Sequence, residues 1–250
     1  GLQHQDGHSQ LLAGGMPNCL AYDPAYGYEL TVIVQDGLKR MFVDRENCFY
    51  YITALNENYP HPAMPDGVAE GIVRGIYLLE AGPRAKLRVQ LFGAGAMLNE
   101  ARAAAKILRE QFDVSADVWS VTSVGELARD GQAALRWNRL HSDKKPRVPY
   151  LTQQLKGHQG PVVLATDYLK ALGEQLRGFV PGDYQVLGTD GFGRSDTRER
   201  LRDFFEVNRN HIALAALHGL QRSGAIEASV VSAAMAKLGI APDKADPLTV

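Results

Sequence analysis

The feature that most constrains the fold of this chain is a regular alternation of short apolar runs and amphipathic stretches from about residue 66 onward. Alternating strands and crossover helices predict an α/β fold with a mainly parallel sheet that is covered by helices. In one amphipathic stretch the apolar face is formed by Leu98, Ala101, Ala105, Leu108 and Phe112. The strands are expected near 88–92, 116–121, 161–166 and 184–188.

The first segment, residues 1 to about 58, is organised differently. Asp23-Pro24 is a recognised helix start signal, and apolar residues then recur at roughly helical spacing, so a helix is expected over 25–42. The stretch 47–55 is rich in aromatic and β-branched residues, which predicts a buried strand.

A proline-rich stretch follows this predicted strand. Pro60, Pro62 and Pro65 lie too close together for a helix or a central strand, so they predict an extended linker. The next residues, 66–80, are expected to form a helix with Asp66 as its N-cap.

Charge and cysteine content exclude several function classes. The chain has 27 basic and 28 acidic side chains, a formal net charge of −1, and therefore no basic excess that would indicate nucleic acid as a partner. Its apolar runs are far shorter than the roughly 18–20 residues of a spanning helix, so no membrane partner is expected. Cys19 and Cys48 form no CxxC pair, and two free thiols favour a reducing compartment such as the cytoplasm.

The first nine residues, GLQHQDGHS, contain the strongest candidate for chemistry. His4 and His8 are four residues apart with Asp6 between them, which is a weak match to a zinc motif because Gly7 interrupts it and the glutamate of HExxH is missing. The alternative is an active-site loop in which His4 acts as acid, base or hydrogen-bond donor. A plain turn with surface histidines also fits these residues.

Two glycine-rich loops are candidates for cofactor sites. FGAGAM, residues 92–97, resembles half of a dinucleotide fingerprint, but Leu98 occupies the place of the third glycine and no suitable acidic residue ends a strand about 20 positions later. The favoured interpretation is a tight strand-to-helix turn.

The second loop, GTDGFGRSDTR, covers residues 188–198 and lacks the GK[ST] of a phosphate-binding loop. Ser195 and Asp196 are expected to cap the following helix, and Arg194 could bind an anion. Glu57 and Asp66 flank the prolines without any acid–base arrangement. These residues by themselves support an α/β enzyme part and do not name a reaction.

Long stretches of the chain carry a resemblance that is more specific. They are GLQHQDGHS, PNCLAYDPAYGYEL, YYITALNENYPHPAMPDG, SVTSVGELARDGQ and LGTDGFGRSDTRERLRDFFEV. In these stretches the chain resembles the C-terminal part of the homodimeric, bacterial-type pyruvate dehydrogenases, which use thiamine diphosphate. It is similar, more distantly, to the transketolases.

The resemblance implies a division of the chain. Residues 1–58 would be the C-terminal part of the pyrimidine-binding domain, 59–82 a linker and connecting helix, and 83–250 a transketolase C-terminal-like domain with a mostly parallel five-stranded sheet. The motif that binds Mg²⁺ and the diphosphate, and the glutamate that activates the cofactor, would lie upstream. No cofactor-binding or metal-binding residue is therefore assigned here, and the chain is expected to be an inactive fragment by itself.

For the intact enzyme the resemblance implies decarboxylation of pyruvate with thiamine diphosphate and Mg²⁺, and transfer of the acetyl group to lipoyl on the dihydrolipoyl acyltransferase partner. The enzyme would be a homodimer. His4 stands where transketolase-like chains carry a histidine that contacts the substrate, so it is the one catalytic residue predicted. The alternatives are another thiamine diphosphate enzyme, such as a transketolase or a different 2-oxo acid dehydrogenase, and an autonomous assembly domain.

Overall fold

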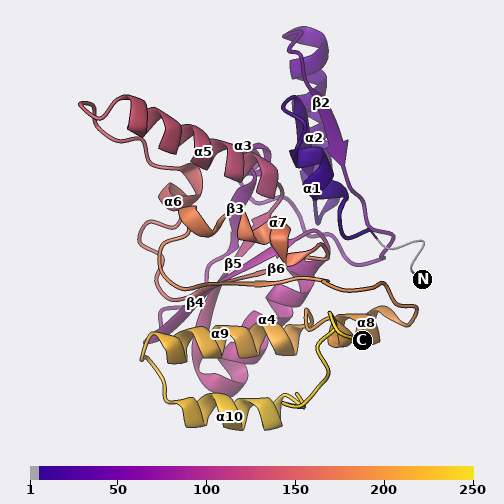
Figure 1. Ribbon diagram of the computed structural model, residues 1–250, viewed down its shortest axis with the longest axis vertical. Helices are drawn as coiled ribbons and strands as arrows, with labels where there is room; N and C mark the ends of the chain where they lie inside the picture. Colours follow the sequence, from indigo (N-terminus) through magenta and orange to yellow (C-terminus); the bar gives the residue numbers. More distant parts are fainter. Residues whose placement is uncertain (1–5) are drawn as a thin grey trace.

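The computed structural model describes residues 6–250 and places a five-stranded sheet at the centre of the larger part of the chain (Figure 1). The strand order is β3-β5-β4-β6-β7, with β3 antiparallel to β5 and the other neighbours parallel. The predicted mostly parallel five-stranded α/β fold is confirmed. The strands are β3 (Ile76–Glu80), β4 (Leu87–Ala94), β5 (Val114–Val121), β6 (Val162–Ala165) and β7 (Tyr184–Leu187).

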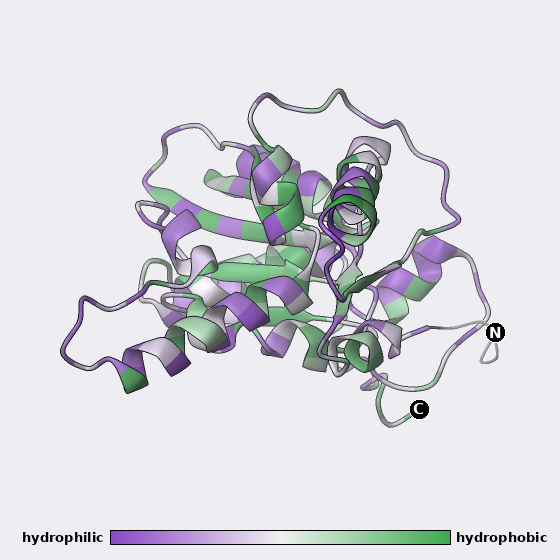
Figure 2. Cartoon of the chain, turned by 90° about the horizontal axis from the view of Figure 1, so that it is seen from above, coloured by the Kyte–Doolittle hydropathy of each residue, from purple (hydrophilic) through white to green (hydrophobic). Residues whose placement is uncertain are grey.

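Helices cover both faces of this sheet, and each face has its own apolar core (Figures 1 and 2). One core includes Leu91, Leu108 and Ile212, and the other is built around Phe92 and Trp119. On the first face lie α4 (Met97–Phe112), α9 (Arg209–Arg222) and α10 (Ala228–Lys237), and on the second α5 (Val124–Leu140), α6 (Tyr150–Gln154), α7 (Lys170–Glu174) and the short η3 (Arg177–Phe179). The remaining helix, α8 (Arg198–Phe204), follows the glycine-rich loop after β7.

The N-terminal segment stands beside this layered part and has a small sheet of its own (Figure 1). Its strands are parallel, with Cys19 opposite Phe49 and Tyr22 opposite Ile52. The elements are α1 (Ser9–Gly14), β1 (Cys19–Tyr22), α2 (Gly27–Leu38), the π-helical turn η2 (Lys39–Val43) and β2 (Phe49–Ile52).

The predicted helix over 25–42 is found, although it begins at Gly27 and passes into η2 near its end. Glu29 fixes the start, because its carboxylate accepts hydrogen bonds from the backbone N–H groups of Ala25 at 2.5 Å and Tyr26 at 2.9 Å. The strand predicted over 47–55 is shorter, and it is only partly buried. The expectation of a buried strand is wrong, because β2 pairs only with β1 among the described strands and its residues are half-buried or exposed.

The prediction of one helix over 66–80 is wrong. The structure has a short helix, α3 (Ala69–Arg74), followed by the strand β3. The N-cap position of α3 is Val68 and not Asp66, and no side chain caps this helix. Gly75 separates the two elements with a left-handed φ of +102°, which a glycine adopts without strain. The residues IYLLE then pair with β5, so tertiary pairing decides their structure.

The proline-rich stretch contains no helix or strand between residues 53 and 65, as expected from its prolines. This stretch, 53–65, is called the linker below. The outer side of α2 also remains uncovered: Leu30, Val34 and Leu38, spaced four apart, are 36%, 42% and 52% exposed. Within residues 6–250, no helix is both long and apolar enough to span a membrane.

Candidate functional site

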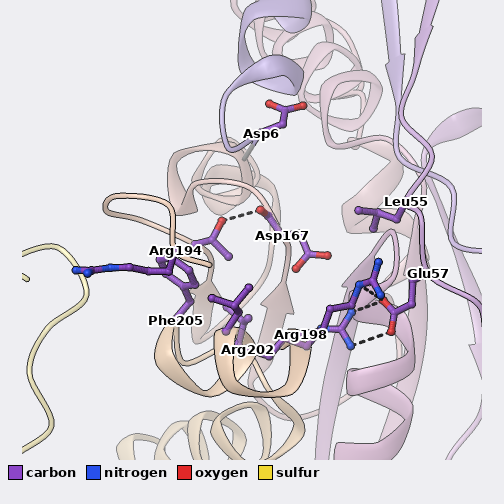
Figure 3. Close-up of a pocket in the computed structure, with 11 residues that line it drawn as sticks. Asp6, Leu55, Glu57, Asp167, Arg194, Arg198, Arg202 and Phe205 are labelled. Carbon is purple, nitrogen blue, oxygen red and sulfur yellow. Dashed lines mark hydrogen bonds and ion pairs between the residues drawn. The ribbon is translucent and has the colours of Figure 1, made fainter. Parts of the chain in front are cut away.

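A cavity of about 330 Å³ lies between the N-terminal segment and the carboxyl edge of the five-stranded sheet (Figure 3). Asp167 follows β6 and Thr189 follows β7, so both reach it from strand ends. This edge is where open parallel sheets generally bind ligands. The apolar part of the wall consists of Leu55, Leu201, Phe205 and Val207.

The charged part of the wall brings together stretches that the sequence singled out separately. Asp6 comes from the HQDGH loop, Glu57 from the start of the linker and Arg194 from the glycine-rich loop after β7. Asp66 does not line the cavity. His4, the predicted catalytic residue, lies outside the described residues, two positions before Asp6.

Glu57 joins the linker to α8 through ion pairs. Its two carboxylate oxygens accept hydrogen bonds from the Arg202 guanidinium at 3.2 and 2.5 Å. Arg198 is 3.8 Å from the same carboxylate and also donates to the backbone carbonyl of Asn56. Burial opposes the charge of Arg202, but the hydrogen bond to Glu57 raises its pKa overall, so the guanidinium stays charged.

The ion-pair network continues into the helical layer below the sheet. Arg202 is 3.6 Å from Glu100 of α4, and Glu100 accepts two further hydrogen bonds, at 2.8 and 2.9 Å, from the guanidinium of Arg209. Although Glu100 is buried, the bonds from Arg209 lower its pKa. The network therefore runs from the linker through α8 to α4 and α9.

Asp167 differs from the other charged residues of the wall. Its carboxylate points into the cavity (Figure 3), and its only described hydrogen bond is made by its backbone carbonyl, which accepts from Thr189 Oγ1 at 2.6 Å. Burial raises the pKa of Asp167 to about 6, with Arg202 acting in the opposite direction. This carboxylate can therefore exchange a proton near neutral pH.

Residues 6–9, the described end of the HQDGH loop, form a turn around Asp6. The Asp6 carboxylate accepts hydrogen bonds from the backbone N–H groups of Ser9 at 2.9 Å and His8 at 3.2 Å, and from the Ser9 hydroxyl. Burial opposes ionisation, but these bonds lower the pKa of Asp6 overall. Both oxygens are thus engaged in the turn that precedes α1, and His8 is exposed.

Asp23 does not line the cavity, but its carboxylate interacts electrostatically with those of Asp6 and Asp167, although the sequence indicates only a turn or cap at this position. Its Oδ1 accepts a hydrogen bond from Thr53 at 2.8 Å, while no described group bonds to Oδ2, which is buried. Burial raises the pKa of Asp23 to about 7, and the neighbouring carboxylate of Asp167 acts in the same direction. An Asp-Pro pair carries no signal for such burial, because the covering groups come from distant segments.

The two glycine loops have mainly structural roles. A Cβ on Gly93 would lie 2.4 Å from Leu98 Cα, and Gly95 has a φ of +52° where it passes the Asp23 carboxylate. The interpretation of FGAGAM as a tight turn is confirmed. In the second loop, the expected caps Ser195 and Asp196 are wrong, because the Thr197 hydroxyl accepts from Arg200 N at 3.4 Å.

Thiamine diphosphate with a divalent metal is the cofactor that the sequence resemblance implies. Among residues 6–250, no three His, Cys, Asp or Glu side chains are grouped so that they could hold a metal ion. The arginines of the cavity are committed to Glu57 and Glu100, apart from Arg194, whose guanidinium lies 5.1 Å over the Phe204 ring. The described residues therefore do not fit a metal-bound diphosphate by themselves.

Comparisons with known proteins agree with this architecture. The profile of the pyruvate dehydrogenase E1 component middle domain matches residues 1–62, and that of the transketolase-like C-terminal domain matches residues 75–208. The pyruvate dehydrogenase E1 component of Pseudomonas aeruginosa is 54% identical over 250 residues, which cover 99% of this chain and 28% of that protein. The chain thus spans little more than a quarter of that relative's length.

Solved transketolases share the fold. A Pichia stipitis transketolase in complex with sedoheptulose-7-phosphate aligns with a TM-score of 0.61 at 19% identity, covering 90% of this chain and 28% of that one. A split-gene transketolase, described as an inactive β4 tetramer, aligns with a TM-score of 0.54 at 18% identity, covering 88% of this chain and 63% of that one.

The fold and the matching profiles define an α/β protein of the transketolase-like class. The chain belongs to the transketolase-like C-terminal domain family, and over its whole length it is similar to the pyruvate dehydrogenase E1 components.

Proposed function

We propose that this chain is the C-terminal part of a thiamine diphosphate-dependent pyruvate dehydrogenase. The 54% identity over nearly the whole chain to a relative of that name carries the proposal. The intact protein would decarboxylate pyruvate and pass the acetyl group to lipoyl on a dihydrolipoyl acyltransferase, as a cytoplasmic homodimer that requires Mg²⁺. Cys19 and Cys48 are free thiols, which supports a reducing compartment.

We propose the same division of the chain as the sequence implied, with residues 1–58 belonging to the pyrimidine-binding domain, 59–82 to the connection and 83–250 to the C-terminal domain. Two observations support an incomplete first domain. Within residues 6–58 its sheet has two strands, although parallel sheets are normally larger and buried on both faces. Its helix α2 also leaves an apolar face exposed.

Thiamine diphosphate would supply the electron sink for decarboxylation. This chain would contribute His4 as a group that hydrogen-bonds the substrate. Asp6 fixes the described end of the HQDGH loop by its bonds to Ser9. The diphosphate and metal ligands would come from parts of the protein outside this chain.

The chain alone should therefore be inactive, as the split-gene transketolase β4 tetramer is described to be. The test compares the 250-residue chain, shown to be folded by circular dichroism, with the longer protein that carries it. Both receive pyruvate, thiamine diphosphate, Mg²⁺ and an artificial electron acceptor. Turnover is expected only from the longer protein. If that protein processes a ketose phosphate and not pyruvate, the transketolase alternative replaces this proposal. Activity of neither, with both folded, favours an assembly domain.

A further inference from the structure

The charged groups around the cavity between the N-terminal segment and the sheet are not equivalent. Arg198 and Arg202 are paired with Glu57, and Arg202 also lies near Glu100. Both oxygens of the Asp6 carboxylate accept hydrogen bonds from Ser9, within the turn that Asp6 begins. All of these groups are already satisfied by neighbours within the described chain.

Two charged groups of the wall have no ion-pair partner among the described residues. The Arg194 guanidinium packs over the Phe204 ring and points away from Asp167 in Figure 3. The Asp167 carboxylate points into the cavity, and burial, rather than any hydrogen bond to this carboxylate, dominates its ionisation. Of these two groups, Asp167 is the one that points into the cavity, and it is an acceptor with negative charge.

The rest of the wall favours an apolar body. Leu55, Leu201 and Phe205 line the cavity together with Val207, and the volume of about 330 Å³ falls in the range of small-molecule sites. Asp167 is half-buried and its carboxylate has no described partner. A cation with N–H donors would form a charge-assisted hydrogen bond with it. A neutral hydroxyl would satisfy the hydrogen bond without the charge, and a carboxylate would be repelled.

We propose that this cavity binds a small organic cation, with a primary ammonium group donating to Asp167 and an apolar body of about four to eight carbon atoms against the apolar wall. The assignment holds whichever reaction the intact protein performs, because it depends only on groups within this chain.

The first test is calorimetric titration of the intact protein with 3-methylbutylammonium. Two probes of similar shape serve as comparisons: 3-methylbutan-1-ol, which keeps a donor without charge, and 4-methylpentanoate, which reverses the charge. The ammonium should bind at one site per chain and at least about tenfold more tightly than either comparison probe, since hydrogen bonds to charged groups exceed neutral ones. Equal affinity for the alcohol, preference for the carboxylate, or no binding of the ammonium up to about 50 mM would overturn the proposal.

Substitutions locate the binding. Asp167→Asn keeps the shape and should weaken ammonium binding at least about tenfold. Asp143→Asn removes the same charge from a side chain that is 72% exposed and paired with Lys144, so it should leave binding unchanged. Leu55→Trp, at a half-exposed position of the wall, should block the cavity and abolish binding with Asp167 intact. Unchanged binding in both Asp167→Asn and Leu55→Trp would place the site elsewhere.

The pH dependence gives an independent readout. The cation binds the ionised form of Asp167, whose pKa is about 6 in the free protein, and the alkylammonium stays charged throughout. Affinity should be constant above about pH 7 and should fall as the pH drops from about 6 to about 5. Affinity that stays flat over this range would contradict the role of Asp167. In the Asp167→Asn variant the dependence should disappear.

Discussion

At the scale of single residues, the sequence pattern does not predict which carboxylates have shifted pKa values. Asp23 and Asp167 each stand in ordinary loop patterns, yet burial raises the pKa values of both. Thr53, Gly95 and Tyr168, which crowd Asp23, come from three separate stretches. The HQDGH loop, by contrast, could be recognised from its sequence as a site of interest, although its geometry at His4 lies outside the described residues.

His4→Ala in the intact enzyme tests the residue assigned from the resemblance. Turnover of pyruvate should fall by about 10²–10³-fold, because one preorganised donor to a developing charge is lost. The free energy of unfolding should change by at most about 0.5 kcal/mol, as for other loop substitutions without packing. His8→Ala is the matched control, since His8 is exposed in the same loop and should matter less. Near wild-type turnover in His4→Ala, or a larger loss in His8→Ala, would mean that His4 is not the residue that contacts the substrate.

Asp23→Asn tests the buried carboxylate through stability rather than activity. The folded-state pKa of about 7 exceeds the unfolded value of 3.8, so the folded state binds the proton more tightly. Wild-type stability should therefore decrease as the pH rises from about 4 to about 7 and then level off. The total decrease should be at most about 4 kcal/mol, at about 1.36 kcal/mol for each unit of the pKa difference.

In Asp23→Asn this decrease should be much smaller. Chemical denaturation at about pH 5 and about pH 8, on either side of the folded-state pKa, provides the comparison. The exposed Asp143→Asn is the control that keeps the wild-type slope. A pH dependence in Asp23→Asn that equals the wild-type one would show that Asp23 is ionised in the folded protein.

At the scale of elements, the sequence predicts best where one pattern decides the structure locally. The helix α5 begins after Ser123, whose hydroxyl accepts a hydrogen bond from Glu126 N at 3.1 Å, as an N-cap serine does. The strands β4 to β7 follow their apolar runs. In contrast, the sequence predicts helix for the residues of β3 because they continue an amphipathic stretch, and only Gly75 and pairing with β5 end that helix.

The strand-to-helix turn of FGAGAM offers a prediction at this scale. Gly93→Ala would place a Cβ 2.4 Å from the backbone of Leu98, so either the turn or α4 must shift. We expect the free energy of unfolding to fall by about 1–3 kcal/mol, as at other overpacked sites. Gly14→Ala is the control, because a Cβ there meets nothing within 4 Å, and it should be neutral or slightly stabilising. Equal effects of the two substitutions in urea denaturation would remove the packing argument for this glycine.

At the scale of the whole molecule, the two parts of the chain are held together by charge as well as by packing. The linker residue Glu57 and α8 residue Arg202 are 145 positions apart, and their side chains are only 21% and 14% exposed. No local pattern reveals this pairing, because it depends on how the N-terminal segment lies against the sheet. The alternation of strands and helices could predict the layers of the larger part, but it could not predict this junction or the cavity beside it.

Glu57→Gln tests the junction. The amide cannot balance the charge of Arg202, which is nearly buried, so the linker should detach more often while the two apolar cores of the larger part stay intact. We expect proteolysis within residues 53–66 to accelerate by about tenfold, which corresponds to a local loss of about 1.4 kcal/mol. Global unfolding in urea should move much less, since the lost contacts lie outside those cores.

Glu46→Gln is the matched control for Glu57→Gln. Its partner Arg40 is 2.7 Å away within the N-terminal segment, so the substitution removes an ion pair without touching the junction. Cleavage of the linker should remain at the wild-type rate in this variant. If Glu57→Gln also leaves that rate unchanged, or if both variants raise it equally, the ion pair with Arg202 does not hold the linker. Apolar contacts, such as those of Tyr59 with the first apolar core, would then hold it.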